Sequence, residues 1–441
     1  MADIREIKTL QNILKKLDPE KPAGQGQSGR TEHQERDGDF HRRLSLEAAN
    51  QDSKTRMLVT GQIGVGKSSE LWHFYRRRFA GMSRTGFWVH SDLEKGEHPE
   101  RCGGTGVLLT ILRDCWGATR SLQPKLRNVS HDVQRRFNDI RSEILEAMID
   151  WLKARKSSSG DSAVFKFGGM DFNVSLKDQD SALGLILGKA AQHEAVSLRS
   201  ERSGLAPDRL VNIMNHLFKW LSRLHSSIPP LVILDHVDKI RDETSAREVL
   251  VELIPIWKKV EASVIMTAPF EYTLGEMRHS VEAYWGKPMM IYPLELPELD
   301  AIELPPFYKQ ICVSSRLDNF ISNDSLRVLA HYSGGIPRTF VQFLIQALKE
   351  AHLSGHNKIM MSDVQAVVFS AQTAYQDYSP EQLELLSQIG KNEVGLGAAS
   401  VLLRSPIGLL VMPPSDGRQP LRIHPLAESV LQNYMRRKKD K

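Results

Sequence analysis

The chain has 441 residues, of which 41% are hydrophobic and 25% are charged, and this balance is typical of a globular protein and excludes a disordered or fibrous one. Its length corresponds to about three domains, and no apolar run approaches the roughly 20 residues that span a bilayer. The net charge is +5, but the last six residues, RRKKDK, contribute +4 of it, so bulk charge says little about the partners of the folded body.

Three cysteines, Cys102, Cys115 and Cys312, lie far apart in the sequence. Their odd number and wide spacing exclude a disulfide scaffold and a CxxC metal site, and they are typical of a reducing compartment. The first residues, MADIREIKTLQN, lack the apolar core of a secretory signal. We therefore expect a cytoplasmic protein that does not cross a membrane.

The N-terminal region, residues 1–40, is expected to hold one helix and a flexible linker. Apolar residues recur at helical spacing over residues 4–17. Residues 18–39 are rich in Pro, Gly, Gln, Ser and charge and show no periodicity, which is typical of a linker or mobile arm.

Between residues 41 and 300, short apolar runs alternate with helical segments, which predicts an α/β fold with a parallel sheet and crossover helices. A helical insert is expected at about 120–225, with an amphipathic helix over 209–224 and a β-hairpin around Gly168-Gly169. The five strands are expected at 57–60, 86–90, 231–235, 263–267 and 289–292.

Two smaller units follow the sheet. Short helices between about 306 and 372 predict a helical lid over residues 301–375. Residues 376–441 are expected to form two helices, two short strands around the turn Asp416-Gly417, a final helix and the basic tail. That order of elements indicates a winged-helix domain.

The sequence GQIGVGKSS follows the apolar strand MLVT and precedes a helix. The pattern G-x-x-x-x-G-K-[ST] is a phosphate-binding loop, whose glycines allow successive backbone N–H groups to turn toward the phosphates of a nucleotide. The lysine would lie against the β- and γ-phosphates, the first serine would ligate Mg²⁺, and the helix N-terminus would add to the anion site. The nucleotide-binding residues are expected to be Gly61, Gln62, Ile63, Gly64, Val65, Gly66, Lys67, Ser68 and Ser69.

A second acidic position comes at the end of the apolar run in PPLVILDHVDK. Asp235 ends a buried strand expected beside the P-loop strand, where an aspartate holds Mg²⁺ together with Ser68. Many vigorous ATPases have Glu immediately after this Asp to polarise water, whereas this chain has His236, and the next acid is Asp238. Either Asp238 acts as the base from that position, or hydrolysis is slow.

These motifs, followed in order by VIMTAP and SGGIPRTF, resemble AAA+-like P-loop ATPases. Within that superfamily, residues 41–430 look most like the STAND signal-transduction ATPases and the related origin-recognition initiators. STAND members commonly lack Glu after the strand-ending Asp, as this chain does.

The resemblance implies further roles. Thr267 would be the first sensor, a polar group that responds to the γ-phosphate, and Pro337 and Arg338 would form the second sensor on the lid, where an arginine can pair with phosphate. Arg278 is similar in position to an arginine finger, and a solvated helix arginine is the alternative. His424 is similar to a histidine that STAND winged helices direct at the diphosphate, and a buried or capping histidine is the alternative.

The C-terminal module lacks the features of a sequence-specific DNA reader. Its expected recognition helix, VGLGAASVLLRS, carries one arginine, Arg404, among apolar residues, and the wing offers only Arg418 and Arg422. The basic tail would add sequence-independent phosphate contacts or act as a solvated tail.

The resulting hypothesis is an ATPase switch that binds ATP and Mg²⁺, hydrolyses ATP slowly and assembles with itself or activates a protein partner. By analogy, it would act in prokaryotic defence or stress signalling. Two alternatives remain open: a DNA-linked AAA+ regulator of replication, recombination or transposition, and a nucleotide-binding scaffold that does not hydrolyse.

Overall fold

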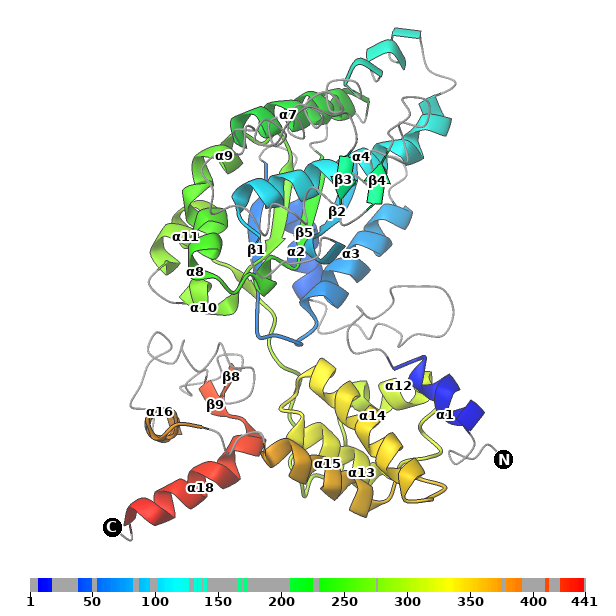
Figure 1. Cartoon of the computed structure of the whole chain (residues 1–441), viewed down its shortest axis with the longest axis vertical. Helices are drawn as coiled ribbons and strands as arrows, with labels where there is room; N and C mark the ends of the chain where they lie inside the picture. The colour runs from blue at the N-terminus through cyan, green and yellow to red at the C-terminus, as the bar shows by residue number, and fades with distance from the viewer. Residues whose placement is uncertain are drawn as a thin grey trace.

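The computed structural model describes an α/β body, a helical lid and a small C-terminal module (Figure 1). The described residues are 7–17, 39–49, 54–81, 87–95, 102–126, 131–132, 134–136, 138–140, 165–167, 170–172, 207–224, 230–274, 277–373, 378–390, 409–411 and 421–439.

The centre of the body is a five-stranded parallel sheet in the order β2-β5-β6-β1-β7. The P-loop strand β1 therefore lies between β7 and β6, and β6 separates it from β5, the strand that ends in Asp235. The expectation that the Asp235 strand would lie beside the P-loop strand is wrong, because β6 pairs with both. This sheet, flanked by helices, is that of an α/β P-loop NTPase. The strands are β1 (Arg56–Thr60), β2 (Trp88–Asp92), β5 (Leu231–Asp235), β6 (Ser263–Thr267) and β7 (Met289–Met290).

Both faces of the sheet are buried, which is why its strands are continuous apolar runs. Leu58 and Val232 belong to the core on one face, and Val59 and Ile233 belong to the core on the other. Residues of α4, α7, α9 and α11 contribute to the first core and residues of α2 and α3 to the second.

The helices of the body follow the expected alternation. The α-helices are α2 (Asp39–Ala49), α3 (Lys67–Gly81), α4 (Gly104–Leu126), α7 (Pro207–Leu224), α8 (Glu243–Arg247), α9 (Ile254–Lys259), α10 (Phe270–Leu274) and α11 (Arg278–Trp285). Shorter helical turns are η1 (Leu93–Lys95), η3 (Val237–Lys239) and the π-helical η4 (Glu248–Glu252).

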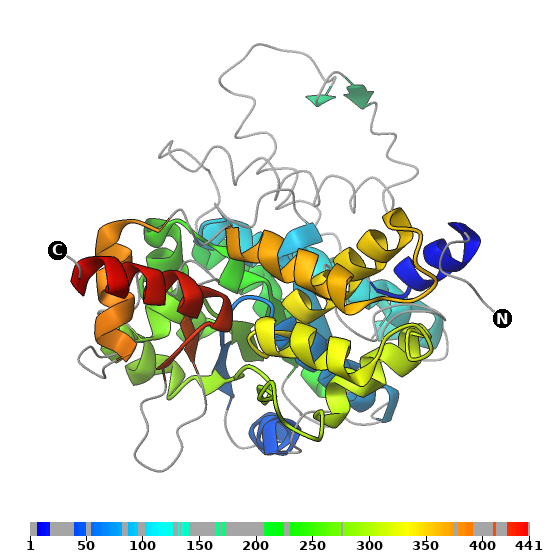
Figure 2. The same ribbon diagram turned by 90° about the horizontal axis from the view of Figure 1, so that it is seen from below.

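The lid has its own hydrophobic core, centred on Tyr308 and Phe340. The N-terminal helix α1 (Ile7–Leu14) lies against this unit, and Ile13 and Leu17 are buried in its core, so the first described segment packs on the lid (Figures 1 and 2). The lid helices are α12 (Pro306–Ser315), α13 (Asn323–Tyr332), α14 (Pro337–Leu353) and α15 (Met361–Thr373).

The C-terminal module contains α16 (Pro380–Gly390), an antiparallel pair of strands, β8 (Leu409–Val411) and β9 (Leu421–Ile423), and α18 (Pro425–Lys439). Leu386 of α16 shares a small core with Phe270 of the body. The expected recognition helix with Arg404, the turn Asp416-Gly417 and Arg418 lie outside the described residues, so the winged-helix hypothesis stays a prediction.

Two expected strands differ in extent from the structure. The strand expected at 86–90 is β2, Trp88–Asp92, and the strand expected at 289–292 is the two-residue β7. The β2 shift has a physical cause: Trp88–Asp92 pairs residue for residue with Leu231–Asp235, so the strand continues through its polar end. In the insert, β3 (Phe165–Phe167) and β4 (Met170–Phe172) pair antiparallel, while the intervening Gly168-Gly169 lies outside the described residues.

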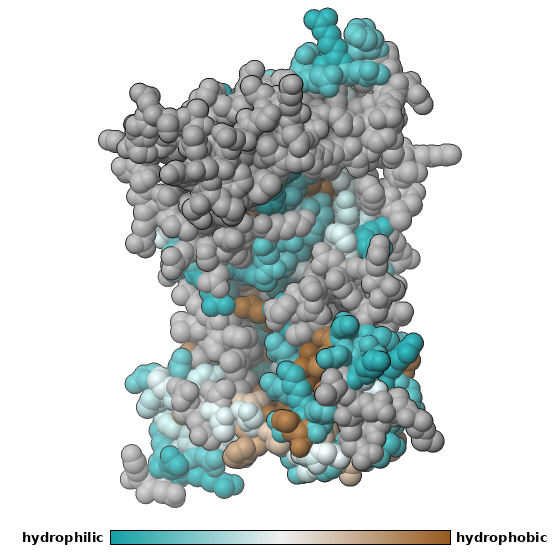
Figure 3. Space-filling model, turned by 45° about the vertical axis from the view of Figure 1, so that its right-hand side comes forward, coloured by the Kyte–Doolittle hydropathy of each residue, from teal (hydrophilic) through white to brown (hydrophobic). Residues whose placement is uncertain are grey.

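The described residues contain no helix that is both long and apolar enough to span a membrane. On the face shown in Figure 3, apolar side chains gather in the lower half of the molecule among hydrophilic ones. The large hydrophobic side chains exposed on the lid and the segment leading to it are Leu299, Ile302, Val313, Leu353, Met360 and Phe369.

Candidate nucleotide-binding site

The P-loop connects the C-terminal end of β1 to the first turn of α3, the position expected from the sequence. Gly64 has a φ of +84°, a left-handed conformation that favours glycine. A Cβ there would lie 2.9 Å from Ile336 Cγ2 and 3.0 Å from Arg338 Cβ. The glycine therefore both turns the loop and allows the lid to approach it.

Lys67 is buried and is held inside the P-loop. Its Nζ donates to the carbonyl oxygens of Gly61 at 2.8 Å and Gln62 at 3.0 Å, and Asp238 Oδ2 lies 2.8 Å away. The ammonium is therefore already placed at the phosphate-binding loop, with a carboxylate as its counter-ion.

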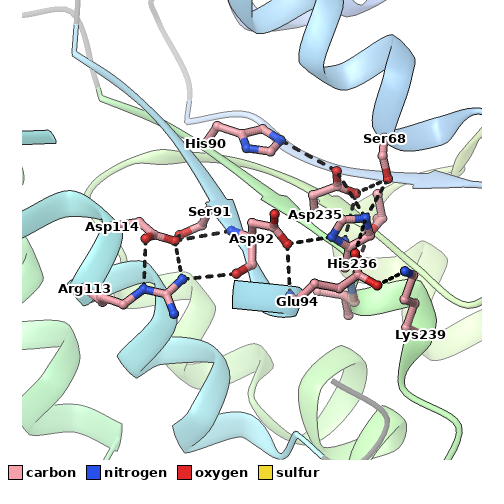
Figure 4. Close-up of polar contacts among 12 residues, drawn as sticks. Ser68, His90, Ser91, Asp92, Glu94, Arg113, Asp114, Asp235, His236 and Lys239 are labelled. Atoms are coloured by element: carbon pink, nitrogen blue, oxygen red, sulfur yellow. Dashed lines mark hydrogen bonds and ion pairs between the residues drawn. The ribbon is translucent and has the colours of Figure 1, made fainter. Parts of the chain in front are cut away.

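Ser68 and Asp235 meet at the end of the sheet. The Ser68 hydroxyl donates to Asp235 Oδ1 at 3.0 Å (Figure 4). Asp235 is fully buried, and although burial raises a carboxyl pKa, the charge of His236 and contacts with His90 outweigh it and lower the pKa of Asp235 to about 2. The aspartate is therefore ionised at neutral pH.

His236 is the residue that stands where many ATPases have Glu, and its backbone is left-handed with a φ of 66°. This conformation costs about 1–2 kcal/mol for a non-glycine residue. It is supported by the bond from His236 N to Asp235 Oδ1 at 2.8 Å. The ring lies between Ser68, with Nε2 3.1 Å from its Oγ, and Asp92, with Nδ1 2.6 Å from its Oδ1.

The carboxylates around His236 keep it charged in this state. Burial lowers the pKa of a histidine, but Asp235, Asp92 and Asp238 together outweigh burial and raise the pKa of His236 to about 9. At neutral pH the imidazole in this arrangement is protonated, and a protonated imidazole cannot accept a proton from water.

A polar network on α4 holds the end of β2 in place. Arg113 is bidentate to Asp114, at 2.9 and 2.8 Å, and also donates to the Asp92 carbonyl at 3.1 Å. Asp114 in turn accepts from the Ser91 hydroxyl at 3.1 Å and from Asp92 N at 3.3 Å. These bonds hold the backbone of Asp92, the residue whose carboxylate contacts His236 (Figure 4).

Glu94 is a further polar residue beside the His236 imidazole. Its Oε2 lies 3.4 Å from His236 Nε2, and its Oε1 is paired with Lys239. Its backbone N–H donates to Asp92 Oδ1 at 2.9 Å. Asp92, Glu94 and His236 each offer one ligand atom, and these atoms lie within 4.8 Å of one another.

The first-sensor candidate, Thr267, is fully buried at the end of β6. Its hydroxyl accepts from Val237 N at 3.0 Å. Thr267 thus braces the turn that carries Asp235, His236 and Asp238.

The second-sensor candidates stand directly over the P-loop. Pro337 is the first residue of α14, and Arg338 N donates to the Gly64 carbonyl at 3.3 Å. Pro at the first position suits a helix start because its missing N–H has no intrahelical partner there. The lid helix therefore begins at the loop that would bind phosphates.

Some of the remaining site residues predicted from the sequence lie on the P-loop, and others lie away from it. Val65 is buried, Ile63 is exposed and Ser69 is half-buried on the P-loop and α3. Arg278 is exposed at the start of α11, where its Nε contacts Glu282 Oε1 at 2.9 Å.

His424 is buried beside the lid loop, where a Cβ on Gly334 would lie 2.4 Å from its Nε2. The structure therefore places His424 against the lid loop that precedes α14, between β9 and α18.

Asp92 and Glu94 were not among the sequence candidates. The strand expected at 86–90 stopped two residues before Asp92, and His236 was read only as a missing Glu. The sequence SDLEK, directly after an apolar strand, could have identified these two acids. Polar groups at the carboxyl ends of neighbouring parallel strands meet at one edge of the sheet.

No protein-family model matches the chain, and no curated protein matches it. Several solved structures align with most of the chain at low identity. ORC2 of Aeropyrum pernix, in ADPNP–ADP complexes, has a TM-score of 0.44 and 12% identity, with 96% of this chain and 98% of that chain covered. Cdc6p of Pyrobaculum aerophilum has a TM-score of 0.41 and 11% identity, with 95% and 88% covered.

A Walker-type ATPase of Pyrococcus abyssi has a TM-score of 0.44 and 13% identity, with 94% of this chain and 99% of that chain covered. Each of these alignments covers most of both chains at 13% identity or less.

The residues present fit a nucleotide with a divalent cation. The hydroxyl of Ser68 and the carboxylate of Asp235 are oxygen donors of the kind that Mg²⁺ prefers. Asp235 Oδ2 is buried and accepts no hydrogen bond from the described residues, so it is an acceptor that a bound cation or its water would satisfy.

Proposed function

We propose that the protein is a nucleotide-dependent switch that binds ATP with Mg²⁺ through residues 61–69 and hydrolyses it slowly. The observation that carries this proposal is the pre-formed group of Lys67, Ser68 and Asp235, in which Lys67 Nζ is held at the P-loop and the Ser68 hydroxyl lies 3.0 Å from Asp235 Oδ1. The charges of Lys67 and Asp235 complement the phosphates and the metal respectively.

Bound Mg²⁺ would neutralise charge on the phosphates. Lys67 would bind the β- and γ-phosphates, and Ser68 and Asp235 would hold the metal. Asp238 would act on water or position Lys67, and Thr267 and Arg338 would report the state of the γ-phosphate. Slow turnover is supported by the residue after Asp235, because His236 stands there in place of the Glu that many ATPases use to polarise water.

The switch would act through the lid. Arg338 N contacts the P-loop at Gly64 O, so a change at the phosphates would be passed to α14. We propose that the output is self-association or activation of a protein partner in the cytoplasm. A role in prokaryotic defence or stress signalling is part of this proposal by analogy.

Nucleotide binding tests the proposal directly. Titration calorimetry of the full chain with ADP and a non-hydrolysable ATP analogue should give Mg²⁺-dependent binding. Lys67→Ala should weaken it by roughly 10- to 100-fold, because a buried charge-assisted contact is lost. Lys259→Ala is the matched control, since Lys259 is exposed and its Nζ lies 2.6 Å from Asp208 Oδ1, away from the P-loop. Equal affinity in wild type and Lys67→Ala would refute the P-loop assignment.

An alternative function in DNA transactions is favoured by the end of α18. Arg436 and Arg437 are exposed there, near the described C-terminal end of the chain (Figure 1). Basic side chains of this kind bind DNA phosphates without reading sequence. ATP turnover that rises when duplex DNA is added at physiological salt would replace the partner switch by this alternative, and unchanged turnover would favour the switch.

A further inference from the structure

The donor set around Ser68 includes a nitrogen ligand as well as oxygen ligands. His236 Nε2 lies 3.1 Å from Ser68 Oγ and 3.4 Å from Glu94 Oε2. Ligands at right angles around a cation with bonds of about 2.1 Å are about 3 Å apart. The imidazole nitrogen therefore stands at the distance from Ser68 that two ligands of the same metal would have.

The orientation of the ring supports a ligand role. Nδ1 is engaged by Asp92 Oδ1 at 2.6 Å, which leaves Nε2 as the nitrogen directed at Ser68. A carboxylate on the far nitrogen is the usual outer partner of a metal-binding histidine, since it fixes the ring and increases its basicity. The backbone of Asp92 is in turn held by Arg113 and Asp114 (Figure 4).

A separate observation points to a cation at this place. Asp235 Oδ2 is fully buried and accepts no hydrogen bond from the described residues. It lies 4.0 Å from His236 Nε2, and the His90 imidazole lies 3.6 Å from it on the other side. A buried carboxylate oxygen of this kind calls for a partner.

We propose that His236 Nε2 is a direct ligand of the cation at the P-loop, together with Ser68 and the carboxylates of Glu94 and Asp235. This inference rests on the proposed nucleotide site and adds the identity of the metal. A mixed nitrogen and oxygen donor set binds first-row transition dications more tightly than Mg²⁺, which prefers oxygen alone. The site would therefore select Mn²⁺, Co²⁺ or Zn²⁺ over Mg²⁺, and metal binding would release the proton from Nε2.

Electron paramagnetic resonance of bound Mn²⁺ tests this ligand. Pulsed spectra of the full chain with Mn²⁺ alone and with Mn²⁺ plus ADP should show the ¹⁴N coupling of a coordinated imidazole. His236→Gln should abolish that coupling and weaken Mn²⁺ binding by roughly 10- to 100-fold, while Mg²⁺ binding should change much less. His279→Gln is the matched control, because His279 is exposed on α11.

Two further variants keep the proposal testable if His236→Gln does not fold. Asp92→Asn should weaken Mn²⁺ binding by roughly 10-fold through loss of ring orientation, and Glu94→Gln, at a partly exposed residue, should also weaken it. Mn²⁺ bound without ¹⁴N coupling, coupling that persists in His236→Gln, or equal losses of Mn²⁺ and Mg²⁺ affinity would overturn the proposal. Absence of nucleotide binding with every metal would instead overturn the proposed function, while the Mn²⁺-only spectra would still decide the role of His236.

Discussion

At the scale of the residue, the site is a set of opposite charges brought together in a buried place. Lys67 contacts Asp238, and His236 contacts Asp92, Glu94 and Asp235. Burial removes water that would otherwise screen these charges, so each group depends on its partners. Removing one charged group should therefore destabilise the charged form of its neighbour.

Asp238 gives the sharpest residue-scale prediction. Asp238→Asn keeps the shape of the side chain but removes the counter-ion of Lys67 and any capacity to act as a base. We expect ATP turnover to fall by at least roughly 10-fold, because a charge-assisted contact of this kind contributes about 1.5–3 kcal/mol. Steady-state phosphate release, with exposed Asp300→Asn as the control, measures the effect. Turnover equal to wild type would exclude Asp238 as the base.

At the scale of the element, the loop before α14 determines how closely the lid meets the body. Gly335 has a φ of +73°, and a Cβ there would lie 2.3 Å from the Leu294 carbonyl oxygen. Leu294 N donates to the Gly335 carbonyl at 2.8 Å. The loop is thus locked against the segment that links the sheet to the lid, and the position of Arg338 follows from it.

A pair of glycine variants tests this lock. Gly355, with a φ of +70°, has no atom within 4 Å of its ideal Cβ, so Gly355→Ala should cost only the left-handed strain of about 1–2 kcal/mol. Gly335→Ala should cost about 1–3 kcal/mol more, because the backbone must also move away from Leu294. Urea unfolding of both variants measures the difference. Equal losses of stability would show that the contact with Leu294 is not restrictive.

At the scale of the whole molecule, a continuous series of contacts joins the P-loop to the C-terminal module. Gly64 contacts the start of α14, and the loop before α14 contacts His424, which lies between β9 and α18. The three parts of the chain meet on one short segment, residues 333–338. A nucleotide-driven shift of the lid would therefore reach α18.

His424 makes this junction sensitive to acid. Burial, and to a smaller extent the charge of His331, lower the pKa of His424 to about 4 against the opposing bond with the Ser333 backbone. Between pH 6.5 and 4, the unfolded chain binds a proton at His424 that the folded chain does not, so stability is full above 6.5 and falls as the pH decreases.

We expect this histidine to account for about 2–3 kcal/mol of stability lost between neutral pH and about pH 4.5. Urea unfolding at both pH values, in wild type and His424→Gln, isolates the effect, because the glutamine does not titrate. The same pH dependence in both proteins would contradict the assignment.

The sequence alone determined the P-loop, the strand that ends in Asp235 and the α/β alternation. These are short-range patterns: an apolar run that fills a buried strand, glycines that a tight turn requires, and a lysine and serine at the first turn of a helix. Each can be read in a window of a few residues, which is why Lys67, Ser68 and Asp235 were predicted in the places where the structure has them.

Only the tertiary structure decided which groups surround His236 and Lys67. Asp92 and His236 are 144 positions apart, and they meet because β2 and β5 are parallel neighbours whose register aligns Asp92 with Asp235. Register and strand order depend on long-range packing of both sheet faces, and no local pattern encodes them. The same reason explains why His236 was read from the sequence as a missing glutamate, whereas the fold surrounds it with carboxylates and directs Nε2 at Ser68.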